Sequence, residues 1–255
     1  MLRILYERFQ QGYRTGPFPK EEPTLSDRFR GLPRLRLEKC PPGCRGCAER
    51  CPFGAIREHN NALALDLGRC LFCADCPACP HGALEFSTDY RLAARRREEL
   101  TVTADRGPEL AAPLDQPLRK LFGRSFKLRQ VSAGGCNACE ADVNVLGTLV
   151  FDLGRFGIQF VASPRHADGI LVTGPVSENM REALLATYAA VPEPKVVIAT
   201  GACAIGGGPF ANAPEVHNGV GALLPVDLFV PGCPPHPYTI LDGLLRLLGR
   251  REATR

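Results

Sequence analysis

The sequence predicts an α/β protein in which a small cysteine-rich unit precedes an open α/β/α domain. Three observations lead to this fold class. From residue 126 onward, short β-type apolar runs alternate with segments that carry an apolar helical face. Three of those runs end in glycine followed by cysteine, at Gly134-Gly135-Cys136, Gly201-Ala202-Cys203 and Gly232-Cys233. Most of the other cysteines, out of 12 in the chain, fall in two blocks between residues 40 and 79.

The composition allows one sizeable hydrophobic core and a smaller unit, since 45% of the 255 residues are hydrophobic. Residues 1–20 carry several charges and no apolar signal-like run. We therefore expect a reducing compartment, where cysteines bind metals rather than form disulfides. No apolar stretch approaches the roughly 20 residues of a membrane-spanning helix, so membrane contact is expected to be indirect or superficial.

Charge is distributed unevenly along the chain, whose formal net charge is +4. Residues 1–130 contain 23 Lys and Arg against 16 Asp and Glu (23 − 16 = +7), and residues 131–255 contain 8 against 11 (8 − 11 = −3). Either the basic half is an ordinary solvated face, or it receives an acidic partner or anionic clusters. A nucleic-acid partner is not expected, because aromatic residues make up only 7% of the chain and no recognition motif is present.

Residues 1–39 are predicted to form an N-terminal helix and a wrapping strap. Leu2, Leu5, Tyr6 and Phe9 recur at helical spacing and share one face. We interpret this helix as a docking element; a position on a membrane surface is the less favoured alternative, because the segment is short. The prolines and charges that follow favour an extended segment.

Residues 40–90 contain two similar cysteine blocks and are predicted to form a small α+β domain. The blocks read Cys40-x3-Cys44-x2-Cys47-x3-Cys51-Pro52 and Cys70-x2-Cys73-x2-Cys76-x2-Cys79-Pro80, and a short apolar run follows each. Such a repeat is typical of bacterial ferredoxins with two [4Fe-4S] clusters, each held by three cysteines of one block and the last of the other. Crossed ligation assigns Cys40, Cys44, Cys47 and Cys79 to cluster A, and Cys51, Cys70, Cys73 and Cys76 to cluster B.

The spacing departs from the ferredoxin pattern at two places, and both involve a ligand of cluster A. Three residues rather than two separate Cys40 from Cys44, and two rather than three separate Cys76 from Cys79. Cluster B keeps regular spacing among its three close ligands and is the better-supported set. A structural zinc site is the alternative, because four-cysteine zinc sites also use C-x2-C pairs.

Residues 91–124, rich in arginine, glutamate and proline, are predicted to be a linker, and residues 125–255 to form the α/β/α domain. The expected strands are Phe126–Ser132, Ile158–Ala162, Gly169–Thr173, Val196–Thr200 and Val226–Val230. The expected helices are Ala138–Leu153, Ser177–Ala190 and Tyr238–Leu248. This alternation favours a flavodoxin-like topology.

Ligands of open α/β sheets gather beyond the carboxyl ends of the strands. Because Cys136, Cys139, Cys203 and Cys233 follow such ends, we expect their sulfurs to converge on one metal centre. The run Gly206–Gly208 is interpreted as a loop that lets backbone approach this centre, rather than as a phosphate cradle, since no lysine or nucleotide fingerprint follows. His217 and His236 each stand alone in their segments and are not counted as ligands.

Four segments of the second domain, GGCNACE, SPRHADGILVTGPV, ATGACAIGGGPF and FVPGCPP, carry a specific resemblance. Residues 126–250 resemble the small electron-transfer subunit of group 4 [NiFe] hydrogenases such as formate hydrogenlyase, and are similar to the homologous 20 kDa subunit of respiratory complex I. Residues 17–100, with the proline-rich strap and both cysteine blocks, look like the two-cluster ferredoxin subunit of the same assemblies. The chain is therefore interpreted as a fusion of the two subunits.

The resemblance implies that Cys136, Cys139, Cys203 and Cys233 hold the [4Fe-4S] cluster nearest the partner's active site. Three clusters of four ligands would then use all 12 cysteines. The Cys136-x2-Cys139 spacing looks like the hydrogenase form, whereas complex I members have two adjacent cysteines there. Glu140 matches an acidic residue that the resemblance makes a candidate for proton transfer near the nickel site. The alternative is a carboxylate that satisfies backbone amides at a helix start.

We therefore expect an oxidoreductase subunit that relays electrons through three [4Fe-4S] clusters to or from an active site in a [NiFe] hydrogenase or complex I-like large subunit. It would lie in the cytoplasm, peripheral on the inner face of the cell membrane through partner subunits. One alternative keeps the relay but has the complex reduce a quinone or another carrier, as complex I relatives do. Another is a non-redox zinc or scaffolding protein.

Overall fold

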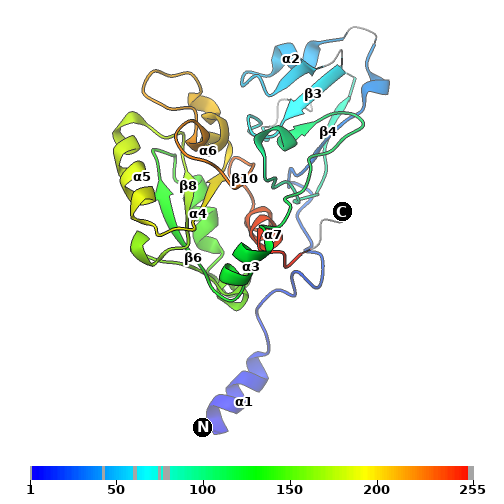
Figure 1. The fold of residues 1–255 in the computed structure, drawn as a ribbon. Coiled ribbons are helices and arrows are strands. Elements are labelled where there is room, and N and C mark those ends of the chain that lie inside the picture. The colour runs from blue at the N-terminus through cyan, green and yellow to red at the C-terminus, as the bar shows by residue number, and fades with distance from the viewer. Residues whose placement is uncertain (1, 42–43, 60–61, 74–75, 77–80, 252–255) are drawn as a thin grey trace.

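The structure, a computed structural model, describes residues 2–41, 44–59, 62–73, 76 and 81–251. It consists of two parts that lie side by side and one helix that stands clear of both (Figure 1). The larger part holds the parallel sheet, and the smaller part holds most of the N-terminal cysteines.

The larger part is built on a five-stranded parallel sheet in the order β10-β9-β8-β6-β7. The strands are β6 (Phe126–Ser132), β7 (Ile158–Phe160), β8 (Gly169–Thr173), β9 (Val196–Thr200) and β10 (Leu228–Val230). Numbered along the chain and read from β7, this order is 2-1-3-4-5, the flavodoxin-like arrangement. The predicted α/β fold with a parallel sheet is confirmed.

Helices cover both faces of this sheet, and the side chains of each strand alternate between two cores. On one face, Ile170 and Val172 pack with Leu184 of α5 (Glu178–Ala190). On the other, Leu171 packs with Val143 of α4 (Ala138–Val145) and Leu244 of α7 (Pro237–Leu247). Burial on both faces explains why these strands read as continuous apolar runs rather than as alternating ones.

All five predicted strands are present, and only the extent of β7 and β10 is shorter than expected. The helix predicted from Ala138 to Leu153 is wrong in its length, because α4 ends at Val145. The chain turns at Gly147, whose N–H donates to the Asn144 carbonyl, and Leu153 reaches the core through a separate 3-10 turn. Apolar residues at helical spacing therefore extended the predicted helix too far, since Leu149 and Val150 are exposed.

The smaller part contains two antiparallel sheets. In one, β1 (Pro33–Leu35) pairs with β4 (Leu84–Phe86); in the other, β3 (Ala62–Asp66) pairs with β2 (Ile56–His59) and β5 (Thr101–Val102). The helix α2 (Gly46–Arg50) lies in the first cysteine block.

Residues 91–124, predicted to be a linker, pack between the two parts. Ala94 forms an antiparallel bridge with Phe229 of the edge strand β10. The Ala111 N–H donates to the Ala93 carbonyl, and the Leu114 N–H donates to the Leu247 carbonyl of α7. The segment ends in the helix α3 (Gln116–Phe122). These bonds fix the smaller part against the parallel sheet and α7.

The strap that follows α1 (Leu2–Gln11) is fastened to the larger part. The Gly16 N–H donates to the Val150 carbonyl at 2.9 Å, and the Arg155 guanidinium donates to the carbonyls of Gly16 and Phe18. Phe18 is buried, whereas no residue of α1 is. The strap is thus held from residue 16 onward, and α1 itself is not packed against the fold.

Candidate metal centres

Four cysteines lie at the carboxyl edge of the parallel sheet. Cys136 and Cys139 follow β6, Cys203 lies in α6 (Ala202–Gly206) just after β9, and Cys233 follows β10. Burial raises the pKa of the Cys139 thiol, and the closeness of the other three cysteines raises it further. Burial also raises the pKa of Cys203 to about 12, with Cys233 and Cys136 contributing. The structure therefore brings these four thiols together.

Two glycines are needed for the backbone to pass close to these sulfurs. A Cβ on Gly201 would lie 2.5 Å from Cys139 Sγ, and a Cβ on Gly208 would lie 2.7 Å from Cys203 Sγ. Both glycines have positive φ, +91° and +56°, which side chains rarely adopt. The glycine run 206–208 therefore approaches a cysteine sulfur closely, in agreement with its interpretation from the sequence.

Glu140 is a buried carboxylate beside Cys139. Ser132 Oγ and Thr173 Oγ1 each donate to its Oε1 at 2.6 Å, from the ends of β6 and β8. Burial raises its pKa, but these hydroxyls and its own backbone N–H together hold the pKa of Glu140 below its usual range. The carboxylate thus ties the first turn of α4 to two strand ends, at the point where the strand order of the sheet reverses.

A second group of thiols surrounds Cys70 in the smaller part. Burial raises the pKa of Cys70 to about 12, the Phe72 N–H lowers it, and the nearby Cys76, Cys73 and Cys51 raise it. These are the four cysteines that crossed ligation assigns to cluster B. Backbone amides also donate to the sulfurs, from Phe72 to Cys70 and from Ala55 to Cys51, both at 3.3 Å. Hydrogen bonds to cysteine sulfur are among the features that set cluster potentials.

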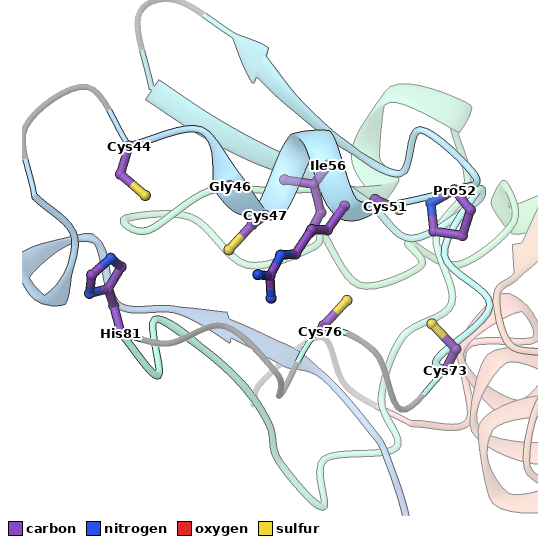
Figure 2. Close-up of a pocket in the computed structure, with 10 residues that line it drawn as sticks. Cys44, Gly46, Cys47, Cys51, Pro52, Ile56, Cys73, Cys76 and His81 are labelled. Atoms are coloured by element: carbon purple, nitrogen blue, oxygen red, sulfur yellow. The ribbon is translucent and has the colours of Figure 1, made fainter.

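A cavity of about 220 Å³ opens between the two cysteine blocks. Its lining includes Cys44, Cys47, Cys51, Cys73, Cys76 and His81. Figure 2 shows the sulfurs of Cys44 and Cys47 directed into this space from the side of α2, with His81 at one end and Cys73 toward the other. Cys40, half-buried, does not line the cavity. Cys79 lies outside the described residues.

The two groups of thiols are neighbours. Burial, then Cys136, then Cys73 raise the pKa of Cys233, so a cysteine of the second group lies within electrostatic reach of the sheet edge. The backbone at Gly68 also packs against the side chain of Ile205 in α6, because a Cβ on Gly68 would lie 2.6 Å from Ile205 Cγ2. The loop that leads to Cys70 is therefore in direct contact with the helix that carries Cys203.

That loop is held by Asp66. Its Oδ1 accepts from the Gly68 N–H at 2.9 Å, and both its oxygens accept from the Arg97 guanidinium at 2.7 Å. The Cys70 N–H donates to the Asp66 carbonyl at 3.0 Å. A bidentate pair of this kind fixes orientation as well as position, so Arg97 holds the loop in place from the segment that was predicted to be a linker.

Ser132, Thr173 and Gly68 are not among the site residues predicted from the sequence. The two hydroxyl residues end predicted strands beside the predicted cysteine site, which was a usable signal; nothing local points to Gly68. Of the two histidines set aside, His217 bonds Glu178 and His236 Nδ1 accepts from the Tyr238 N–H at the start of α7. Within the part of the chain that the structure describes, no three His, Cys, Asp or Glu side chains gather closely enough to hold a single metal ion.

The family model described as NADH ubiquinone oxidoreductase, 20 Kd subunit, matches residues 136–247, which include all four sheet-edge cysteines. The probable membrane-bound hydrogenase subunit mbhJ of Pyrococcus furiosus is 44% identical over 131 residues, or 51% of this chain and 78% of that protein. The chain belongs to the family of the 20 kDa subunit of NADH ubiquinone oxidoreductase. Membership of this family implies that it binds an iron–sulfur cluster.

Two further members of the 20 kDa subunit family show the range of its complexes. Formate hydrogenlyase subunit 7 of Escherichia coli is 41% identical over 144 residues, which are 56% of this chain and 56% of that protein. A subunit of the NADH-quinone oxidoreductase of Heliobacterium modesticaldum is 44% identical over 116 residues, or 45% of this chain and 66% of that one. The relatives are thus oxidoreductase subunits of hydrogenase and complex I-like assemblies, and each alignment covers about half of this chain.

No helix in the described ranges has the length and apolar character that crossing a bilayer requires.

Proposed function

We propose that the chain is an iron–sulfur electron-transfer subunit of a membrane-associated hydrogenase-type complex, peripheral on the inner face of the cell membrane. It would hold three [4Fe-4S] clusters and relay electrons to or from the active site of a separate large subunit. One observation carries the proposal: Cys136, Cys203 and Cys233 all lie close enough to Cys139 to raise the pKa of its thiol, at one sheet edge and within the stretch matched by the 20 kDa subunit family. Bound clusters supply one-electron oxidation and reduction.

The residues at the sheet edge fit such a group. Four thiols lie near one another there, and Gly201 and Gly208 keep side chains away from two of the sulfurs. Cys203 is buried and Cys139 half-buried, whereas Cys136 and Cys233 are exposed. Burial raises the pKa values of Cys139 and Cys203, which favours their protonated thiols when no metal is bound, so ligation by these two residues would release protons. The chain's own contribution is ligands, burial and a fixed position.

The N-terminal part would be a two-cluster ferredoxin unit fused to this domain. The mutual closeness of Cys51, Cys70, Cys73 and Cys76, and the amide hydrogen bonds to two of their sulfurs, support cluster B. Cluster A, with Cys40, Cys44, Cys47 and Cys79, rests on the repeat of two cysteine blocks, despite its irregular spacing, and on the shared cavity that Cys44 and Cys47 line. Cys73 raises the pKa of Cys233, and this electrostatic effect supports cluster B as the neighbour of the sheet-edge site.

Two kinds of complex fit this relay, and they differ in the partner. The Cys136-x2-Cys139 spacing and the relatives named as hydrogenase or formate hydrogenlyase subunits favour a [NiFe] large subunit. The equally similar relative from a NADH-quinone oxidoreductase supports a complex that reduces a quinone instead. Purification of the native complex, with assays of hydrogen and of quinone turnover, separates the two. Hydrogen turnover would support a [NiFe] large subunit as the partner. Quinone reduction without hydrogen turnover would overturn that assignment.

Cysteine variants test the assignment of ligands within the chain. Cys233→Ser should remove the EPR signal of the sheet-edge cluster and leave the two ferredoxin-type signals. Its matched control is Cys79→Ser, which should perturb cluster A and leave cluster B and the sheet-edge signal. Loss of all signals together in the Cys233 variant would contradict separate sites, and loss of cluster B in the Cys79 variant would contradict the crossed ligation.

A further inference from the structure

The helix α1 (Leu2–Gln11) exposes all its large apolar side chains. Leu2, Leu5, Tyr6 and Phe9 are 84%, 64%, 59% and 88% exposed, and Tyr13 just beyond the helix is equally free of the core. Ile4 is 71% exposed and lies on the opposite face of the helix, outside this set. Scattered exposed leucines are ordinary, but a set of large apolar residues gathered on one element marks an interaction surface.

These side chains form a stripe with basic residues on both sides. At 3.6 residues per turn, Leu2, Leu5, Tyr6 and Phe9 fall within an arc of about 100°, with Arg8 about 60° beyond one edge and Arg3 about 60° beyond the other. Within the described residues, the polar contacts of α1 side chains stay local: Arg3 lies 4.0 Å from Glu7, Arg8 donates to the Gly12 carbonyl, and Gln10 donates to Tyr6.

The position of α1 leaves this stripe accessible. Figure 1 shows the helix well clear of both parts of the fold, joined by a single extended segment, and on the far side from α2. A second exposed apolar pair, Leu149 and Val150, lies where that segment is fastened, because the Val150 carbonyl accepts from the Gly16 N–H. A second exposed apolar site therefore lies at the base of the segment that carries α1.

We propose that α1 lies flat on the surface of an anionic lipid bilayer, with its stripe among the acyl chains and its arginines at the headgroups. The arginines on both edges of the stripe carry the argument: their aliphatic stems can follow the apolar face down while the guanidinium groups stay with phosphates. Residues 1–20 contain a single acidic residue, Glu7, and four basic ones: Arg3, Arg8, Arg14 and Lys20. This excess of positive charge complements an anionic surface.

Two other arrangements fit less well. Ten residues of helix are about 15 Å long, half the thickness of a bilayer core, so α1 cannot span one. Pairing with a second copy would bring Arg3 and Arg8 of both chains to the same seam, where like charges repel. A single short helix binds lipid weakly, so α1 would add a direct contact to the attachment that partner subunits provide.

The experiment uses the full chain and a tryptophan probe, because the sequence contains no tryptophan. Phe9→Trp places the probe on the stripe, and Ile4→Trp places it nearly opposite on the same helix. Each protein is mixed with vesicles of phosphatidylcholine alone or of phosphatidylcholine with phosphatidylglycerol. We expect a blue shift of emission for Phe9→Trp with the anionic vesicles only, reversed by high salt, and no shift for Ile4→Trp.

A co-sedimentation series tests the same surface without a probe. Leu5→Glu should abolish binding to anionic vesicles, whereas Ile4→Glu, the same change of charge and polarity on the opposite face, should reduce it no more than a few-fold. Equal loss in both variants, or equal binding to neutral vesicles, would overturn the proposal. So would a concentration-dependent dimer in light scattering that Leu5→Glu dissociates, since a second copy would then cover the stripe. The outcome is independent of cluster content, and its failure would leave the proposed electron transfer untouched.

Discussion

The contact between Gly68 and Ile205 makes a specific prediction for Gly68→Ala. The new Cβ would lie 2.6 Å from Ile205 Cγ2 and 2.7 Å from Arg97 Cζ. Carbon atoms in contact lie at about 3.5–4.0 Å, so the loop to Cys70 and the helix α6 must separate by roughly 1 Å. Gly68 has no positive φ, and the effect is therefore one of space rather than of backbone strain.

Arg97 cannot easily move aside, because both oxygens of Asp66 bind its guanidinium at 2.7 Å. Overpacking of this kind costs about 1–3 kcal/mol of unfolding free energy. In a chain of this size each kcal/mol lowers the melting temperature by about 2–4 °C. We expect the loss of stability in Gly68→Ala to lie in that range. The variant should also weaken the magnetic interaction between the clusters proposed at Cys70 and Cys203, while iron content stays unchanged.

A double-mutant cycle checks the reasoning. Ile205→Ala removes Cγ2 and should itself destabilise a buried site by about 2–5 kcal/mol. In its presence Gly68→Ala should cost less than in the native chain, because only the contact with Arg97 remains. The matched control is Gly221→Ala, where no atom lies within 4 Å of the added Cβ. Strictly additive losses for Gly68 and Ile205, or an equal effect at Gly221, would refute the direct contact. An unchanged EPR splitting despite lower stability would refute its role in setting the distance between the two sites.

Three further predictions concern buried polar groups. Glu140→Gln should lower the free energy of unfolding by about 1 kcal/mol, because Ser132 and Thr173 then donate to a neutral acceptor. Slower hydrogen turnover at unchanged cluster content would support a role of Glu140 in proton transfer. Unchanged turnover would mean that Glu140 only anchors the helix α4 to the strand ends. Asp242→Asn should cost about 3–5 kcal/mol in denaturant unfolding, since it leaves the fully buried Arg246 without its carboxylate, which now accepts at 2.8 Å; the double replacement Asp242→Leu with Arg246→Met should cost far less, and equal losses would contradict this. Burial lowers the pKa of His236, so the unfolded chain takes up a proton near pH 6.5 that the folded chain resists; stability should fall as pH drops through this range, and His236→Asn, which keeps a capping side chain, should remove that component, whereas an unchanged pH profile would exclude it.

Much of the parallel domain could be predicted because its local signals agree. Runs such as Gly169–Thr173 and Val196–Thr200 are apolar throughout, and glycine marks their ends, so the strands were identified with little error. Once the strands were identified, the sequence placed Cys203 and Cys233 just beyond two strand ends, where the structure has them. Where local signals conflicted, prediction failed: Leu149 and Val150 keep helical spacing, yet α4 has already ended before Gly147.

The contacts between the two parts could not be predicted, because they join residues that are far apart in sequence. Asp66 and Arg97 carry no mark of their pairing, and the close approach of Gly68 to Ile205 depends on the final placement of α6. In residues 91–124, where proline and charge suggested a linker, composition gave no sign that Ala93, Ala94 and Leu100 are fully buried. Such packing depends on tertiary context rather than on local propensity.

The proposal that every cysteine serves an iron–sulfur cluster can be tested by one analysis of the anaerobically purified full chain. Iron, acid-labile sulfide and zinc are measured per polypeptide on the same sample. Three [4Fe-4S] clusters predict about twelve iron and about twelve sulfide per chain, and no stoichiometric zinc. Bound zinc with no labile sulfide would contradict the account, because the thiol groups around Cys70 and Cys139 would then be structural sites without redox function.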